Sequence, residues 1–198
     1  MATVVVPFRG SDPKRRLDPI SDDGRLRLAE AMLGDVLDAA LAVGRTFVVS
    51  PDRPALPEGV EPVKDQRHGQ GAAVRAALDA AAAAGSPAPY LVVNADLPCV
   101  TPRDLLALAG AIPEGGIAIA PAADGTTNAI GLADQRLFEP LYGDGSAERY
   151  AALGPSRLVD APNLVDDVDT LDDLHRVADR LGPRTREALD ELEREAAA

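Results

Sequence analysis

The chain alternates short β-branched runs with amphipathic segments, and this order constrains its fold more than any other feature. Residues 3–6 read TVVV, an unbroken run typical of a central strand buried on both faces. Residues 21–44 then carry apolar side chains at spacings of three or four and end at a glycine, which predicts a helix. Because strand–helix–strand crossovers are right-handed, repeated units of this kind predict a mostly parallel mixed sheet with helices on both faces.

Further elements follow in the same order. Strands are predicted at residues 46–49, 90–93, 117–120, 128–132 and 163–168, and helices at 70–84, from 102, at 146–153, from 171 and from 183. Thr101, Ser146 and Thr170 are expected to be helix caps. The stretch at 50–69 is rich in Pro and Gly and is predicted to be irregular. We expect one domain over residues 1–198, with ligands beyond the carboxyl ends of the strands.

The charge balance excludes several classes of partner. The chain has 20 basic and 32 acidic residues and a net charge of −12, which argues against binding to nucleic acid or to an anionic membrane. A single cysteine, Cys99, excludes an internal disulfide and a multi-cysteine metal site. No apolar run approaches the roughly 20 residues that span a bilayer, so we expect a cytoplasmic protein. Ala-rich helices and an exposed sheet edge could support a homodimer.

Four cations lie in the loop that follows the first predicted strand. These are Arg9, Lys14, Arg15 and Arg16, beside Gly10 in the segment PFRGSDPKRRLDP. Cations and free backbone N–H groups at a strand-to-helix loop can hold a polyphosphate and neutralise the charge on a leaving pyrophosphate. A solvated basic loop is the alternative. The GxxxxGK[ST] pattern of a P-loop is absent.

Carboxylates follow two predicted strands at the same edge of the sheet. Asp96 lies in the segment NADLP just after the strand at 90–93, where it could ligate Mg²⁺. Asp167 and Asp169 lie at the carboxyl end of the last predicted strand, on one side of the chain, so either could share a cation with Asp96. The alternative for these residues is a turn or helix-capping role, although Thr170 already supplies a cap.

Five segments, taken in order, resemble one known family: PFRGSDPKRRLDP, NADLP, GTTNA, GDGS and DVDTLDDL. They are similar to the 2-phospho-L-lactate or phosphoenolpyruvate guanylyltransferases of deazaflavin coenzyme (F-420) biosynthesis, and the similarity covers nearly the whole chain. The resemblance implies an α/β single-domain nucleotidyltransferase with a glycosyltransferase-A-like, Rossmann-like fold. It also implies Mg²⁺ as cofactor and transfer of GMP from GTP to a small phosphorylated three-carbon acid, with release of pyrophosphate. Phosphoenolpyruvate is the favoured acid because the Arg- and Ala-rich composition is typical of bacterial members.

The resemblance also implies roles for individual residues. Lys14 and Arg16 would contact the GTP phosphates, and Arg9 belongs to the same basic loop. Asp96 and Asp167 would bind the metal, and Asp169 remains a second candidate for the latter position.

Four further residues would bind substrates. Thr127, Gly143 and Ser146 match positions that hold the carboxylate of the acid. Gly71 departs from an Asn expected near its position and could let backbone groups approach the purine. Two other functions remain open: a nucleotidyltransferase for a molybdopterin-type or sugar-phosphate acceptor, and a non-catalytic nucleotide-binding protein.

Overall fold

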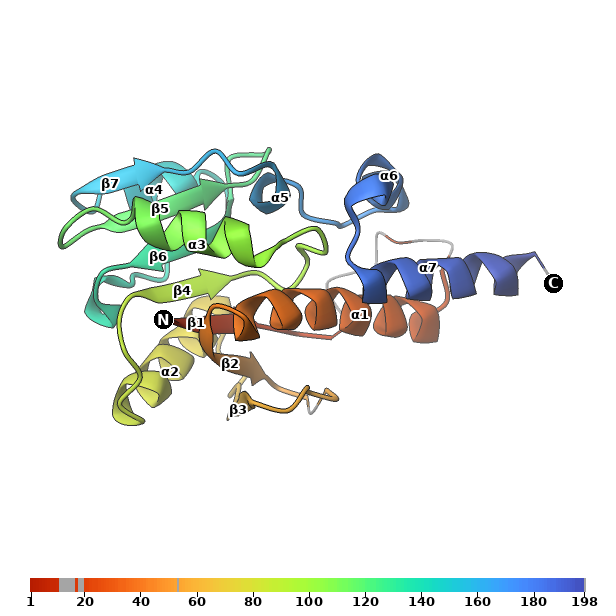
Figure 1. Ribbon diagram of the computed structural model, residues 1–198, viewed down its shortest axis with the longest axis horizontal. Helices are drawn as coiled ribbons and strands as arrows, with labels where there is room; N and C mark the ends of the chain where they lie inside the picture. Colours follow the sequence, from red (N-terminus) through yellow and green to blue (C-terminus); the bar gives the residue numbers. More distant parts are fainter. Residues whose placement is uncertain (11–16, 18–19, 53, 198) are drawn as a thin grey trace.

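The computed structural model describes residues 1–10, 17, 20–52 and 54–197. The described residues form one seven-stranded sheet in the order β3-β2-β1-β4-β6-β5-β7 (Figure 1). The strands are β1 (Ala2–Pro7), β2 (Gly44–Ser50), β3 (Val60–Lys64), β4 (Tyr90–Val93), β5 (Ile117–Pro121), β6 (Thr127–Leu132) and β7 (Ser156–Leu158). Among them, β6 runs antiparallel to both of its neighbours, β4 and β5, and every other pairing is parallel. The predicted mostly parallel mixed sheet is therefore confirmed.

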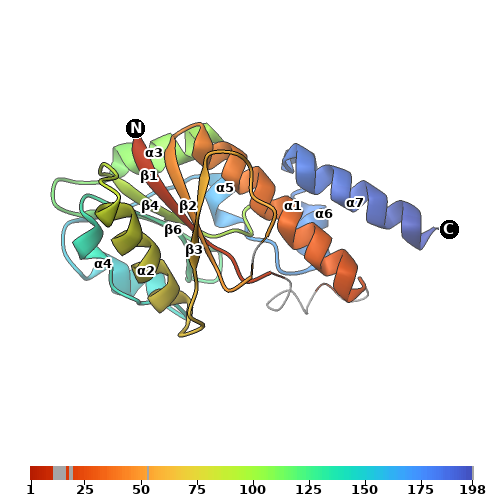
Figure 2. The same ribbon diagram turned by 90° about the horizontal axis from the view of Figure 1, so that it is seen from below.

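Helices cover both faces of the sheet, as predicted (Figure 2). One face packs against α1 (Asp22–Leu41), α3 (Pro102–Ala111), α5 (Pro162–Val165) and α6 (Leu171–Arg176). The other packs against α2 (Gln70–Ala83) and α4 (Ser146–Ala151). Two short 3₁₀ helices, η2 (Gln135–Leu137) and η3 (Ala178–Arg180), lie in the connections. Among the residues described, no helix is long and apolar enough to cross a membrane.

The C-terminal helix α7 (Pro183–Ala196) lies along α1 in both views (Figures 1 and 2). Its first turn is anchored by Asp35, a carboxylate of α1 that is only 5% exposed. This carboxylate accepts hydrogen bonds from the backbone N–H of Arg184 at 3.0 Å, from the N–H of Thr185 at 2.9 Å and from the Thr185 hydroxyl at 2.6 Å. A negative charge buried at the start of a helix satisfies N–H groups that have no partner within the helix.

Two strands were missed and one was wrongly predicted. The stretch predicted to be irregular contains β3, whose Pro62 is tolerated because β3 is an edge strand and needs hydrogen bonds on one side only. The other edge strand, β7, is three residues long and exposed, so it has no apolar pattern to find. The strand predicted at 163–168 is wrong. Pro162 starts the short helix α5 there, and a loop follows it.

The predicted caps are confirmed at two of three positions. Thr101 and Thr170 each form a capping box, with Asp104 and Asp173 respectively. Ser146 is not a cap, because Gly145 occupies the N-cap position in a left-handed conformation and Ser146 is the first residue of α4. The Ser146 side chain is therefore available for a contact elsewhere in the fold.

Candidate active site

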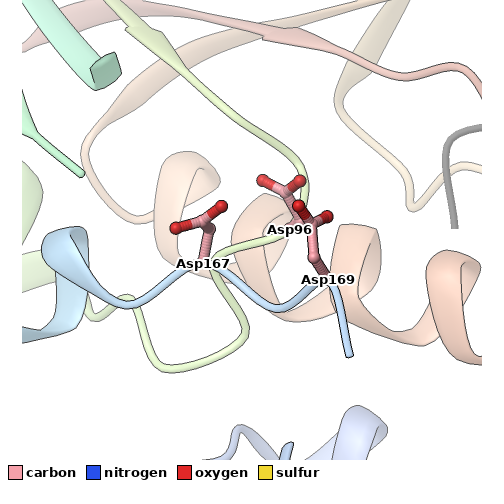
Figure 3. Close-up of side chains that lie close together, drawn as sticks. All are labelled: Asp96, Asp167 and Asp169. Atoms are coloured by element: carbon pink, nitrogen blue, oxygen red, sulfur yellow. The ribbon is translucent and has the colours of Figure 1, made fainter. Parts of the chain in front are cut away.

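Three carboxylates meet beyond the carboxyl ends of the central strands (Figure 3). Asp96 follows β4, and Asp167 and Asp169 lie in the loop after α5. Carboxylate oxygens of the three residues lie within 4.8 Å of one another. The backbone N–H of Val168 donates to the Asp96 carbonyl at 3.0 Å, which holds the second segment against the first. The loop thus brings together the carboxylates that the sequence indicated, although it is not the strand that was predicted.

Electrostatics favour a cation in this cluster. Burial raises the pKa of Asp167, and the nearby charge of Asp96 raises it further, while a hydrogen bond from Asn128 opposes the shift. Carboxylate oxygens that repel one another in a half-buried place are hard ligands of the kind that Mg²⁺ prefers. The donor set therefore fits a magnesium ion held by Asp96, Asp167 and Asp169, and this assignment stays a prediction.

Ion pairs and a hydrogen bond hold the loop that carries Asp167 and Asp169. Arg180 donates to the Asp166 carboxylate at 2.5 Å, and Arg176 lies 3.7 Å from the same group. The backbone N–H of Asp169 donates to Asp173 at 3.2 Å. Contacts from α6 and η3 thus restrict the loop at Asp166 and Asp169.

A pocket of about 230 Å³ opens beside Asp96 at the end of β1. Its lining residues are Pro7, Phe8, Arg9, Gly10, Ala29, Met32, Gln70, Asn94, Ala95 and Asp96. Arg9 is exposed at this pocket, as expected for a cation that meets a phosphate. Lys14, Arg15 and Arg16 fall outside the described residues, so the roles of Lys14 and Arg16 stay predictions.

Two hydroxyl groups, one on β6 and one on α4, form a buried pair. Oγ of Ser146 and Oγ1 of Thr127 lie 2.9 Å apart, and the two residues are 0% and 5% exposed. The resemblance indicated both for one ligand, and the fold places them together from positions 19 residues apart. Arg149 organises the adjacent turn, because its guanidinium donates to the carbonyls of Tyr142 at 3.1 Å and Gly143 at 3.5 Å. Gly143 has φ of +97°, a conformation that favours glycine.

Comparison with known proteins identifies the family. Residues 25–160 match the model of the MobA-like NTP transferase domain. Over 92% of its length the chain is 34% identical to a phosphoenolpyruvate guanylyltransferase of Geodermatophilus obscurus, of which it covers 91%. A 2-phospho-L-lactate guanylyltransferase of Halomicrobium mukohataei is 36% identical over 88% of the chain and 84% of the relative. The chain belongs to this guanylyltransferase family. It is therefore a nucleotidyltransferase, and the recognised resemblance is confirmed.

Two other comparisons extend the picture of this guanylyltransferase. A relative in Phenylobacterium zucineum is named a 3-phospho-D-glycerate guanylyltransferase and is 33% identical, with 97% of each chain covered. The crystal structure of a putative nucleotide-diphospho-sugar transferase from Desulfovibrio desulfuricans superposes with a TM-score of 0.74 at 19% identity, covering 98% of both chains. That likeness confirms the fold of a nucleotidyltransferase.

Gly71 has a structural reason to be glycine in this enzyme. A Cβ atom at this position would lie 2.4 Å from Cβ of Pro140, so the start of α2 packs against the chain that leads to α4. Gly71 does not line the pocket beside Asp96, whereas its neighbour Gln70 does. The close approach of Pro140 therefore explains the glycine, and its purine-binding role stays a prediction.

Three amide side chains, to which the sequence motifs assigned no role, lie at this site. Gln70 donates to Asn94 at 3.2 Å, and Asn94 donates to the Thr127 carbonyl at 3.3 Å, which links the pocket to the hydroxyl pair. Asn128 contacts Asp167. Asn94 lies in the segment NADLP and Asn128 in the segment GTTNA. Their positions in these segments were the sequence feature that could have indicated a role at the site.

Proposed function

We propose that this enzyme transfers GMP from GTP to phosphoenolpyruvate and releases pyrophosphate, as a step in deazaflavin coenzyme F-420 biosynthesis. The observation that carries the proposal is the cluster of Asp96, Asp167 and Asp169 beside the pocket that Arg9 lines. A polyphosphate needs cations, and the pocket and the carboxylates offer a side-chain cation and a place for a metal ion. The names of the relatives support a phosphorylated three-carbon acid as acceptor.

The proposed reaction is an in-line displacement at phosphorus. An oxygen of the acceptor's phosphate attacks the α-phosphorus of GTP and forms a new P–O bond. The bond from the α-phosphorus to the oxygen shared with the β-phosphate breaks, and its electron pair leaves with pyrophosphate. The attacking phosphate is already ionised near neutral pH, so no general base is needed, and neither His68 nor His175 need act as one.

The side chains of the enzyme bind and orient the two substrates. When bound by Asp96 and Asp167, Mg²⁺ would neutralise negative charge on the phosphate oxygens of GTP. Arg9, with Lys14 and Arg16 of the same loop, binds the phosphates. Thr127 and Ser146 donate hydrogen bonds to the carboxylate of the acid, which a hydroxyl can do without adding charge. Fixing both substrates in line supplies much of the acceleration.

The test is pyrophosphate release with Mg²⁺, with each of GTP, ATP, CTP and UTP against phosphoenolpyruvate, 2-phospho-L-lactate and 3-phospho-D-glycerate. Mass spectrometry of the product names the donor and the acceptor together. Guanylylated phosphoenolpyruvate is the expected product. A different guanylylated acid would correct the acceptor alone, and turnover with none of the three acids would refute the proposal.

The metal assignment has its own variant. Asp96→Asn should abolish turnover, since it removes a charged ligand while keeping the shape of the side chain. Asp190→Asn is the matched control, because Asp190 is exposed on α7 and far along the chain from the cluster. Equal turnover in the two variants would refute the role of Asp96.

A further inference from the structure

One residue of β6 departs from the alternation of its strand. In the pairing of β6 with β5, Ala129 lies opposite Ala120 and Thr127 lies opposite Pro121. Asn128 is therefore an extra residue that has no pairing partner on β5. This is a β-bulge, a feature that redirects a side chain and is frequent next to active sites. Its effect here is to turn the Asn128 side chain to the other face of the sheet.

The packing on each face of the sheet shows that the Asn128 side chain has changed face. Ala129 packs in the core shared with α1 and α3, and Ile130 packs in the core under α2 and α4. Regular alternation would place Asn128 on the side of Ile130. Instead, its amide nitrogen donates to the carbonyl of Val165 at 3.0 Å and to Oδ1 of Asp167 at 3.4 Å, both on the side of α5. Thr127, one residue earlier, bonds to Ser146 of α4 on the opposite side.

Asn128 touches both segments that carry the carboxylates. Its side chain donates to Asp167, and its backbone carbonyl accepts a hydrogen bond from the N–H of Asn94 at 3.0 Å, two residues before Asp96. The residue is 2% exposed, so solvent cannot replace these bonds readily. One buried residue thus sets the position of β4's end and of the loop after α5 relative to each other.

We propose that Asn128 is a positioning residue for the metal: it holds the Asp167 carboxylate in place to receive a divalent cation. The inference rests on the metal site of the proposed function. An amide suits this task because it donates to a carboxylate without adding charge, whereas a carboxylate here would repel Asp167. Without the donor, Asp167 would be free to rotate away from the like charges of Asp96 and Asp169.

The test measures metal binding directly, with Mn²⁺ alone as the probe and electron paramagnetic resonance as the readout. Asn128→Leu keeps the volume and removes the donor, and it should weaken Mn²⁺ binding by about 10- to 100-fold, as loss of a partner behind a metal ligand does. The Mg²⁺ concentration for half-maximal turnover should rise by a similar factor, and saturating Mg²⁺ should restore most of kcat. Asn128→Ser, which is smaller, gives a second variant should the leucine fail to fold.

A matched control separates positioning from general damage. Thr126→Val also removes a donor to a carboxylate, that of Asp124, but this pair is exposed and outside the cluster. It should leave the Mn²⁺ affinity unchanged. A lower melting temperature and kcat in Asn128→Leu, with wild-type Mn²⁺ affinity, would mean a structural role and would overturn the inference.

A third variant, Asp167→Asn, distinguishes a wrong role for Asn128 from a wrong metal site. If Asp167→Asn loses Mn²⁺ binding and both Asn128 variants retain it, the inference alone is overturned. If Asp167→Asn and Asp96→Asn both bind Mn²⁺ as the wild type does, the metal site itself is wrong and the inference falls with it.

Discussion

Replacing Thr127 by valine tests the hydroxyl pair that we assign to the acid substrate. Valine has nearly the same shape, so the change removes the hydroxyl and leaves Oγ of Ser146 without the partner that lies 2.9 Å away. Because Ser146 is 0% exposed, its hydroxyl would then be buried and unpaired. Such a loss costs about 1–3 kcal/mol of unfolding free energy.

The same change should also weaken acceptor binding, by an amount of similar size that is measured separately. A hydrogen bond to a charged group is worth about 1.5–3 kcal/mol. This corresponds to an increase of about 10- to 150-fold in the KM of the acid. We expect kcat and the KM of GTP to change far less, since neither hydroxyl lines the pocket beside Asp96. Steady-state kinetics with each substrate varied in turn measures all three constants.

Two further variants serve as controls for Thr127→Val. Thr126→Val removes a hydroxyl bonded to the exposed Asp124, and it should cost at most about 1 kcal/mol because water can replace the bond. The double variant of Thr127→Val with Ser146→Ala should be no less stable than Thr127→Val, since no buried hydroxyl remains unpaired. A KM for the acid within twofold of wild type in Thr127→Val would refute the acceptor role. Equal stability of Thr126→Val and Thr127→Val would refute the energetic argument.

Three predictions concern stability and can be measured by urea unfolding. Asp35→Ala should lose about 1–3 kcal/mol for each buried donor that it leaves unpaired at the start of α7. Asp38→Ala breaks only an exposed ion pair worth about 0–1 kcal/mol, so equal losses in the two variants would contradict this. Gly71→Ala should lose about 1–3 kcal/mol by overpacking, whereas Gly110→Ala, in an open place on α3, should gain about 0.5–1 kcal/mol. The Arg136 side chain lowers the pKa of Asp134 to about 2. Asp134→Asn should therefore be less stable than wild type above about pH 4 and equal to it below about pH 2. A difference in stability that persisted at lower pH would exclude the ion pair as its cause.

The ion pair of Asp134 with Arg136 links the stability of the protein to pH. The folded-state pKa of Asp134 lies below its ordinary value of 3.8, so the folded protein holds the ionised form more favourably than the unfolded chain does. The stabilisation is complete above the ordinary value and disappears as the pH falls through about 2. Asp134 is partly exposed and its partner Arg136 is largely exposed, so the effect is small and should weaken as salt is added.

Local patterns in the sequence determined most of the elements. The strand at 90–93 has the predicted bounds, and the capping boxes at Thr101 and Thr170 begin their helices where expected. These signals are reliable because apolar periodicity and capping act between residues a few positions apart. The edge strand β3 and the short β7 escaped detection because half-exposed strands need little apolar patterning.

The segments that carry the site were also visible in the sequence, but their mutual arrangement was not. Asp96 follows a strand as predicted, whereas Asp167 and Asp169 reach it from a loop held by Arg180. Only the fold shows that Gly71 faces Pro140, 69 positions along the chain.

Tertiary structure alone decided which face of the sheet each of these side chains reaches. Insertion of β6 between β4 and β5, with a bulge at Asn128, sends Thr127 to one face and Asn128 to the other. The physical reason is that the chain's own periodicity sets the type of each element, while strand order and register depend on packing between residues far apart in sequence. The sequence thus indicated carboxylates and hydroxyls for this site, and the packing of the sheet decided which of them meet and which amides contact them.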